Sequence, residues 1–203
     1  MENISTIIFD LGGVIMDIDV KKTLAAFSNM GLSNVHEYFG HGFAASFFSD
    51  HEAGKITDEE FLQEIKNLLG GEVSDEVVID AWNALLLRFP PERIALLSTL
   101  KNRYRLFLYS NTNAIHQEKF QDIYRRAFSS ELDSLFEKAY YSHELGQRKP
   151  ETAGFEQIIR ENNLDPKQTL FVDDALMNVE GAIKAGLKGL YLPPGIFITD
   201  LIW

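Results

Sequence analysis

The sequence contains no cysteine among its 203 residues, which excludes disulfide bonds, thiolate catalysis and zinc sites built on cysteine. Long hydrophobic runs are also missing, because no apolar stretch approaches the ~18–20 residues that a membrane-spanning helix needs. The first residues, Met1-Glu2-Asn3, carry no basic charge and do not resemble the start of a signal peptide. These absences predict a cytoplasmic protein that has no contact with a membrane.

Positive charge is scarce as well. The chain has 19 lysine and arginine residues against 30 aspartate and glutamate residues, which gives a net charge of −11. Nucleic acids and anionic membranes select basic surfaces, so this balance argues against both as partners. Residues 50–80 alone contain ten acidic and two basic residues, and we interpret them as solvated helix faces.

The hydrophobic pattern changes character along the chain, whose length suits one domain or one domain that carries an insert. Residues 4–9 form a short apolar run that predicts a buried strand followed by a tight turn. From about residue 20 to residue 88 the periodicity is helical throughout. Within it, Thr57 and Glu60 form a capping box, and the helix that they open ends at Gly70-Gly71. Ser74 begins another helix, whose apolar stripe runs from Val77 to Leu86.

After Pro90-Pro91, predicted strands and helices alternate. The strands are residues 105–109, 138–141, 169–172 and 189–192, and the helices are residues 94–101, 114–126, 151–162 and 176–185. This alternation predicts an α/β fold with a parallel sheet covered on both faces. Ligands of such sheets bind beyond the carboxyl ends of the strands, so the residues that follow each strand are the candidates for function.

Polar residues stand at four of these positions. They are Asp10 after the first strand, Ser110 and Asn111 after the next core strand, Lys149 near the start of the following helix (with Pro150 at its first position), and Asp173 and Asp174 after a later strand, with Asn178 one helical turn further on. Alone, each is most often a cap or turn residue. Their joint occurrence at strand ends, in this order, is hard to explain if all of them are only cap or turn residues.

The residues at the strand ends suit one kind of chemistry. Carboxylate oxygens bind Mg²⁺, which also accepts oxygens of a substrate phosphate. Lys149 and the backbone amides that follow Ser110 would hold the remaining phosphate oxygens, so Ser110, Asn111 and Lys149 are the predicted phosphate-binding residues. Asp10 can then attack phosphorus in line, as carboxylates do in aspartyl-phosphate enzymes. The metal and the lysine would screen the repulsion between the two anions.

The same residues resemble the four motifs of the haloacid dehalogenase (HAD) superfamily, and the resemblance covers essentially the whole chain. It implies a Rossmann-like, three-layer core of residues 1–16 and 89–203 and an inserted small helical cap of residues 17–88. It also implies that Asp10 is the nucleophile, that Asp10, Asp174 and the backbone carbonyl of Gly12 bind Mg²⁺, and that Asp173 and Asn178 support the site. In such enzymes the cap closes over the site and selects the substrate.

One position departs from the family pattern. The family usually has a second aspartate two residues after the nucleophile, as general acid and then base, and here that residue is Gly12. General acid–base catalysis contributes roughly 10²–10⁴-fold, so its loss would slow the enzyme without abolishing turnover. The alternatives are Asp17 or Asp19, which lie downstream, a water on the metal, or no acid at all.

These observations predict an Mg²⁺-dependent phosphatase that hydrolyses a small phosphorylated metabolite. Residues 52–57 and 171–174 resemble a branch that contains sugar-phosphate phosphatases, for example those acting on glucose 1-phosphate. The alternative is a non-catalytic phosphate-binding or regulatory protein that lost turnover with the second aspartate. A phosphomutase is disfavoured by Gly12, because it needs an acid/base. The five histidines are scattered, and we expect most of them at the surface, whereas the apolar C-terminal tail should pack on the core.

Overall fold

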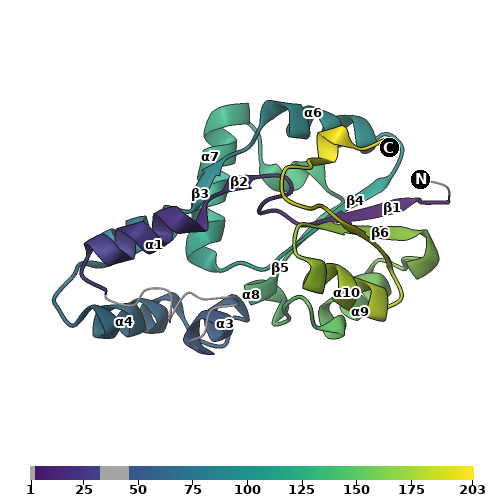
Figure 1. Ribbon diagram of the computed structural model, residues 1–203. Helices are drawn as coiled ribbons and strands as arrows, with labels where there is room; N and C mark the ends of the chain where they lie inside the picture. Colours follow the sequence, from purple (N-terminus) through teal and green to yellow (C-terminus); the bar gives the residue numbers. More distant parts are fainter. Residues whose placement is uncertain (1–2, 33–45) are drawn as a thin grey trace.

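A computed structural model describes residues 3–32 and 46–203 of the chain. Its centre is a parallel sheet of five strands in the order β5-β4-β1-β6-β7 (Figure 1). The strands are β1 (Thr6–Phe9), β4 (Arg105–Ser110), β5 (Lys138–Tyr141), β6 (Thr169–Asp173) and β7 (Lys188–Tyr191). The α/β fold predicted from the alternating pattern is therefore confirmed.

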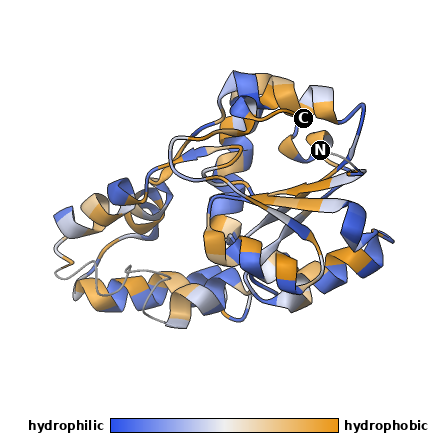
Figure 2. Ribbon diagram, turned by 45° about the vertical axis from the view of Figure 1, so that its right-hand side comes forward, coloured by the Kyte–Doolittle hydropathy of each residue, from blue (hydrophilic) through white to orange (hydrophobic). Residues whose placement is uncertain are grey.

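Helices cover both faces of the sheet, and the strands are largely hydrophobic (Figure 2). Successive side chains of a strand point to opposite faces, so Ile7 and Phe9 pack on one side and Ile8 on the other. The flanking helices are α6 (Pro91–Leu100), α7 (Ala114–Phe128), α8 (Ser142–Leu145), α9 (Thr152–Glu161) and α10 (Leu176–Lys184). Short 3-10 helices are Leu132–Leu135, Pro166–Gln168 and Ile198–Asp200.

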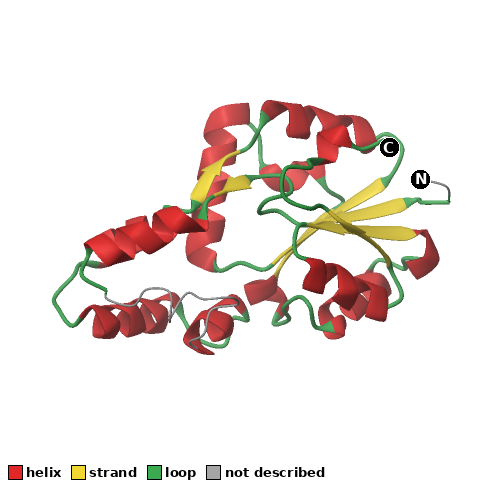
Figure 3. Cartoon of the chain, in the orientation of Figure 1, coloured by secondary structure: helices red, strands yellow, loops and turns green. Residues whose placement is uncertain are grey.

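The described parts of residues 17–88, namely 17–32 and 46–88, are called the helical region below and extend away from the sheet (Figure 3). Their elements are β2 (Asp17–Ile18), α1 (Val20–Asn29), α3 (Ser46–Glu52), α4 (Asp58–Leu69), α5 (Asp75–Asn83) and β3 (Leu86–Arg88). The helices pack around a second apolar cluster, which includes Phe61 and Trp82 and is completed by Ile115 of α7. The capping box of Thr57 and Glu60 is present as predicted, and Gly70 ends α4 with a φ of 66°.

The periodicity was helical up to residue 88, but the structure places a strand there. β2 and β3 pair antiparallel, with Asp17 opposite Arg88. Both chain segments that connect the helical region to the core pass through this strand pair. The predicted helix after Ser74 therefore ends at Asn83, and its stripe does not reach Leu86. Val77, at the start of that stripe, is 48% exposed.

Three smaller expectations had mixed outcomes. The histidine prediction was wrong for His51 and His116, which are both buried, while two histidines at positions 36 and 41 lie outside the described residues. The C-terminal tail packs on the core through Ile198, although Ile202 is 91% exposed. Pro150 does not open a helix, since α9 begins at Thr152. Within residues 3–32 and 46–203, no helix has the length and apolar character required to cross a membrane.

Candidate active site

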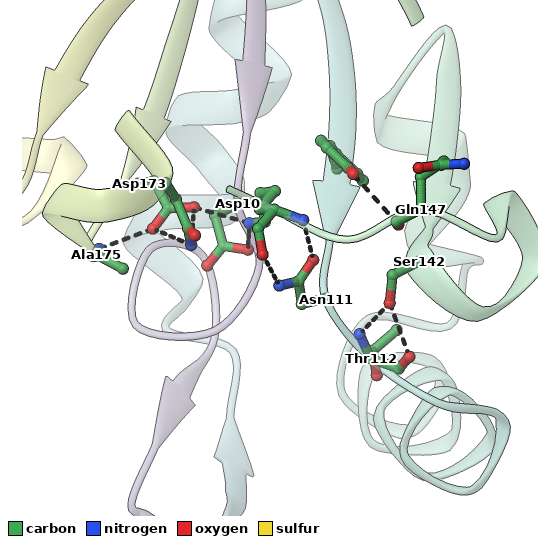
Figure 4. A network of polar contacts seen from close by, with 10 residues as sticks. Asp10, Asn111, Thr112, Ser142, Gln147, Asp173 and Ala175 are labelled. Carbon is green, nitrogen blue, oxygen red and sulfur yellow. Dashed lines mark hydrogen bonds and ion pairs between the residues drawn. The ribbon is translucent and has the colours of Figure 1, made fainter. Parts of the chain in front are cut away.

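The carboxyl ends of the three central strands bring the predicted residues to one edge of the sheet. Asp10 directly follows β1, which lies between β4 and β6. Phe9, just before Asp10, pairs in register with Leu108 of β4 and Val172 of β6. The side chains beyond these strands therefore meet. Figure 4 shows the resulting polar network, which runs from Ala175 and Asp173 past Asp10 to Asn111, Thr112 and Ser142.

Lys149 lies at the centre of this network, with a side chain only 1% exposed. Its Nζ donates to Asp10 Oδ1 at 2.5 Å and to Asp173 Oδ2 at 2.7 Å. Burial alone would lower the pKa of Lys149, but the two carboxylates outweigh burial and hold this pKa above its ordinary value. The lysine is therefore a permanent cation between the two aspartates.

Asp173 is fully buried and its carboxylate is surrounded by donors. Oδ1 accepts from the backbone N–H of Ala175 at 2.7 Å, and Asn178 Nδ2 lies 3.2 Å from Oδ1 and 3.1 Å from Oδ2. Together with Lys149, these donors satisfy both oxygens. Asp173 and Asn178 were predicted to support the site, and this role stays a prediction. The structure places both beside Lys149, with the oxygens of Asp173 occupied by protein donors.

Asp10 and Asp174 remain as the carboxylates that could hold a cation. Oxygen atoms of Asp10, Asp173 and Asp174 all lie within 4.8 Å of one another. Burial raises the pKa of Asp10 to about 7 against the opposing effect of Lys149, and burial and Asp173 raise that of Asp174 to about 6. Three carboxylates against one ammonium leave two negative charges, which a divalent cation with a preference for oxygen would neutralise. The residues present thus fit Mg²⁺.

The turn after β1 is shaped for this cluster. Gly13 has a φ of 77°, and a Cβ atom at this position would lie 2.1 Å from Asp174 Oδ2. Only glycine therefore lets the turn pass so close to that carboxylate. Gly12 lies in the same turn and lines the cavity beside Asp10. A Cβ atom at Gly12 would lie 3.2 Å from Ile18 Cδ1. A larger residue would therefore fit there only if the end of the Ile18 side chain moved slightly.

The loop after β4 is held by its own side chains. Asn111 Nδ2 donates to the Lys149 carbonyl and Asn111 Oδ1 accepts from the Lys149 N–H, both at 2.9 Å. Ser142 Oγ accepts from the Thr112 N–H at 2.9 Å and donates to the Thr112 carbonyl at 3.0 Å. Asn111 was predicted to bind phosphate, but its side chain is engaged by Lys149. Its contribution to phosphate binding would come from its backbone N–H, beside the buried Ser110.

His116 is a residue of this site that the sequence did not indicate. Asn113 caps α7 by accepting from the His116 N–H at 3.0 Å, and this fixes the Asn113 amide so that Nδ2 faces His116 Nδ1 at 3.1 Å. Nε2 donates to the Trp82 carbonyl at 3.1 Å, and the two rings stack 4.5 Å apart. Burial lowers the pKa of His116 to about 4, so the ring is neutral.

The two aspartates considered as replacement acids both have structural partners. Asp17 binds Arg93 at 3.0 Å and Arg88 at 3.3 Å, at the base of the β2–β3 ladder. Asp19 caps α1 by accepting from the Lys21 N–H at 3.1 Å. Either side chain would have to leave these partners to reach a leaving group.

The cluster opens into a cavity of about 190 Å³. Its polar lining comes from the strand-end residues together with Asn178 and His116. The apolar side chains are Leu11, Met16, Ile18, Leu85, Leu86 and Phe120. Among the described lining residues, His116 is the one ionisable side chain besides Asp10, Lys149 and Asp174. Within residues 3–32 and 46–203, the lining of this small cavity therefore contains no carboxylate besides Asp10 and Asp174.

Comparisons with known proteins agree with this geometry. A profile of the haloacid dehalogenase-like hydrolases matches residues 4–186. A D-ribitol-5-phosphate phosphatase of Bacteroides thetaiotaomicron is 32% identical over 188 residues, which cover 91% of this chain and 90% of the relative. A solved HAD family enzyme of the same organism, in complex with magnesium and inorganic phosphate, is 32% identical, with a TM-score of 0.87 and coverage of 95% and 96%. A predicted HAD-like hydrolase of Porphyromonas gingivalis reaches a TM-score of 0.86 at 31% identity, with coverage of 95% and 93%.

Proposed function

The chain belongs to the haloacid dehalogenase-like hydrolases and is a phosphoric monoester hydrolase, and from this premise we propose that it dephosphorylates a small sugar or polyol phosphate through Asp10. Mg²⁺ is the cofactor of this enzyme. The single observation that carries the proposal is the placement of Asp10 against Lys149, with Asp174 beside them at the mouth of a small cavity. The helical region of residues 17–88 would be the cap of this site.

The proposed reaction begins with attack of an Asp10 carboxylate oxygen on phosphorus. A bond forms between this oxygen and phosphorus while the ester bond to the leaving alcohol breaks, and the phosphoryl group is then carried by Asp10. Lys149 neutralises charge next to the nucleophile, and the backbone amides after Ser110 face the phosphoryl oxygens. Asp10, Asp174 and the Gly12 carbonyl would hold Mg²⁺, which supplies positive charge that screens the two reacting anions. Water then releases phosphate and restores Asp10.

Protonation of the leaving alcohol is assigned to no protein side chain. Gly12 has none, Asp17 and Asp19 are engaged elsewhere, and burial keeps the His116 ring neutral. The proton therefore comes from solvent in this proposal. The expected consequence is a turnover lower than an enzyme with a positioned acid would reach.

The proposed substrate class follows from the size of the cavity and from the relatives. A volume of about 190 Å³ suits a phosphate with a short carbon chain. The relative at 32% identity acts on D-ribitol 5-phosphate, and this compound is the first candidate. A phosphate-binding protein without turnover is the second candidate, which the glycine at position 12 favours.

Phosphate release separates the two candidates. The panel contains D-ribitol 5-phosphate, glucose 1-phosphate and other pentose, hexose and polyol phosphates, with Mg²⁺ or with EDTA. We expect release that requires Mg²⁺, and none from the isosteric variant Asp10→Asn, whose melting temperature shows that it is folded. If folded wild-type protein released phosphate from no compound, the catalytic proposal would be wrong, and a rise in melting temperature with these compounds would support the binding protein.

A further inference from the structure

Besides its chain connections, the helical region touches the core at two places: α5 packs on α7, where Trp82 stacks on His116, and α3 packs on α8. The chain connections run through β2 and β3, in the upper half of the molecule in Figure 1, whereas α3 meets α8 in the lower half. The turn after α3 approaches α8 so closely that a Cβ atom at Gly54, which has a φ of 66°, would lie 2.2 Å from the His143 carbonyl oxygen. The helical region is therefore attached covalently at one end and by non-covalent contact at the other.

A partly buried ion pair crosses this contact. Glu52, the last residue of α3, accepts through Oε2 from Arg148 Nε at 2.9 Å and from Arg148 Nη2 at 2.5 Å. The side chains are 10% and 24% exposed. Burial raises the pKa of Glu52, and Arg148 opposes this rise by favouring the carboxylate. A charge left here without its partner would be costly, so the pair favours the docked arrangement of α3.

The position of Arg148 in the chain connects this pair with the active site. Arg148 directly precedes Lys149, whose ammonium binds Asp10 and Asp173 and whose backbone is held by Asn111. A pair that fixes Arg148 thus acts on the segment that presents Lys149. The same pair sets how closely the helical region lies against that segment.

We propose that Glu52 is a positioning residue for the reaction: its ion pair with Arg148 holds the helical region docked beside Lys149, and the reaction takes place in this docked arrangement. The inference rests on the proposed function. Glu52 need not touch the substrate, because its effect is carried by Arg148 and by the docking of α3. Displacement of reacting groups by about 1 Å can cost about 10²-fold in rate, so loose docking should be visible in turnover.

The test compares Glu52→Gln, Arg148→Gln, the double variant and Glu137→Gln. The last is the matched control, because Arg105 and Glu137 form a similar pair at the opposite, amino-terminal end of the strands, with side chains 39% and 47% exposed. We measure kcat and KM for the best substrate of the panel, and inhibition by inorganic phosphate. Hydrogen exchange of the α3 and α8 amides reports docking without turnover.

We expect Glu52→Gln to lower kcat roughly 10- to 100-fold. Inhibition by phosphate, which reports the core site itself, should stay within about threefold of wild type, whereas a collapsed site would lose it. Exchange of the α3 and α8 amides should rise, and Glu137→Gln should change none of these. Because one pair is responsible, the double variant should lose no more than Glu52→Gln alone.

Wild-type kcat and exchange in Glu52→Gln, or losses of the single variants that add in the double variant, would overturn the inference. If Glu52→Gln does not fold, the double variant decides, since it leaves no unpaired buried charge. It should fold with lowered kcat and faster exchange, and wild-type values would refute the proposal. If wild-type protein releases no phosphate at all, the proposed function fails, and the exchange experiment still decides whether this pair docks α3 on α8.

Discussion

Asn111 and Lys149 are joined by two hydrogen bonds of 2.9 Å: Asn111 Nδ2 donates to the Lys149 carbonyl, and Asn111 Oδ1 accepts from the Lys149 N–H. The residues are 38 positions apart in sequence. A side-chain amide here acts as a backbone partner, so the loop after β4 and the Lys149 segment form one unit. The position of the ammonium between Asp10 and Asp173 depends on this unit as well as on the two carboxylates.

Asn111→Ala should therefore lower kcat/KM although Asn111 makes no side-chain contact with the ammonium. We expect a loss of roughly 10- to 100-fold, because Lys149 would be displaced from its place next to Asp10. Steady-state phosphate release measures the loss. Asn102→Ala is the control, since Asn102 is exposed and its side chain donates only to the Ser98 carbonyl, at 3.4 Å. An Asn111→Ala enzyme with wild-type kcat/KM would contradict this role.

Lys149→Met should destabilise the metal-free protein and increase its stabilisation by Mg²⁺. Removing the ammonium leaves three carboxylates close together, and loss of one member of a buried pair typically costs about 3–5 kcal/mol. Added Mg²⁺ replaces the missing charge, so the melting temperature should rise more than in wild type. Melting curves with EDTA and with Mg²⁺ measure both effects. Lys138→Met, which breaks an exposed pair with Glu161, should change neither, and a smaller Mg²⁺ response of Lys149→Met would refute the argument.

Much of the fold followed from local patterns. Each predicted strand after residue 90 agrees with the structure to within one residue at each end, since buried parallel strands are short apolar runs. The gathering of Asp10, Ser110 and Asp173 followed from topology, because the ends of parallel strands share one edge. The structure brings these residues together, and their chemical roles remain predictions.

The remaining features depend on contacts between distant segments. Leu86–Arg88 is a strand because it pairs with Asp17 and Ile18, about 70 residues earlier, which a local periodicity does not reveal. Ser142 and His116 are site residues through the groups that they meet, and neither carries a recognisable motif. The sequence shows Arg148 beside Lys149, but its partner Glu52 is 96 residues away.

Binding of Mg²⁺ should release protons near neutral pH. Without metal, the pKa values of Asp10 and Asp174 are raised to about 7 and about 6, and the metal requires both carboxylates in the ionised form. Affinity should therefore weaken as the pH falls below 7, by roughly tenfold per pH unit for each proton displaced. Titration calorimetry in two buffers of different ionisation enthalpy gives the proton count. No proton release at a pH between the two values would contradict these shifts.

His116 should make the protein less stable in acid. Its pKa is about 4 in the folded protein and about 6.5 in the unfolded chain, so the unfolded state binds the extra proton between these values. The contribution of neutral His116 to the free energy of unfolding is complete at a pH above the unfolded-state pKa. It is lost as the pH falls towards 4, and the total loss is about 3 kcal/mol. His116→Phe keeps the stacking on Trp82 without the titrating group. The difference in unfolding free energy between wild type and this variant, from urea curves, should shrink as the pH falls, and a constant difference would refute the assignment.

Gly13→Ala should weaken Mg²⁺ binding through a steric effect on Asp174. The added Cβ atom would lie 2.1 Å from Asp174 Oδ2, so the carboxylate or the turn must move. Gly13→Ala should also lose stability because of the φ of 77°, a conformation that disfavours every residue with a side chain. Gly70→Ala isolates this loss of stability, because Gly70 has a φ of 66° and a Cβ atom there meets nothing within 4 Å.

Both glycine variants should therefore lose a similar, small amount of stability to backbone strain, roughly 1 kcal/mol. Only Gly13→Ala should also lose Mg²⁺ affinity. We expect a loss of roughly tenfold or more, because the carboxylate of Asp174 is displaced from the metal. Titration calorimetry gives the affinity, and urea curves in EDTA give the stability. Equal affinities in the two variants would mean that Asp174 can hold the metal from another position, and the close approach of the turn would then serve the fold alone.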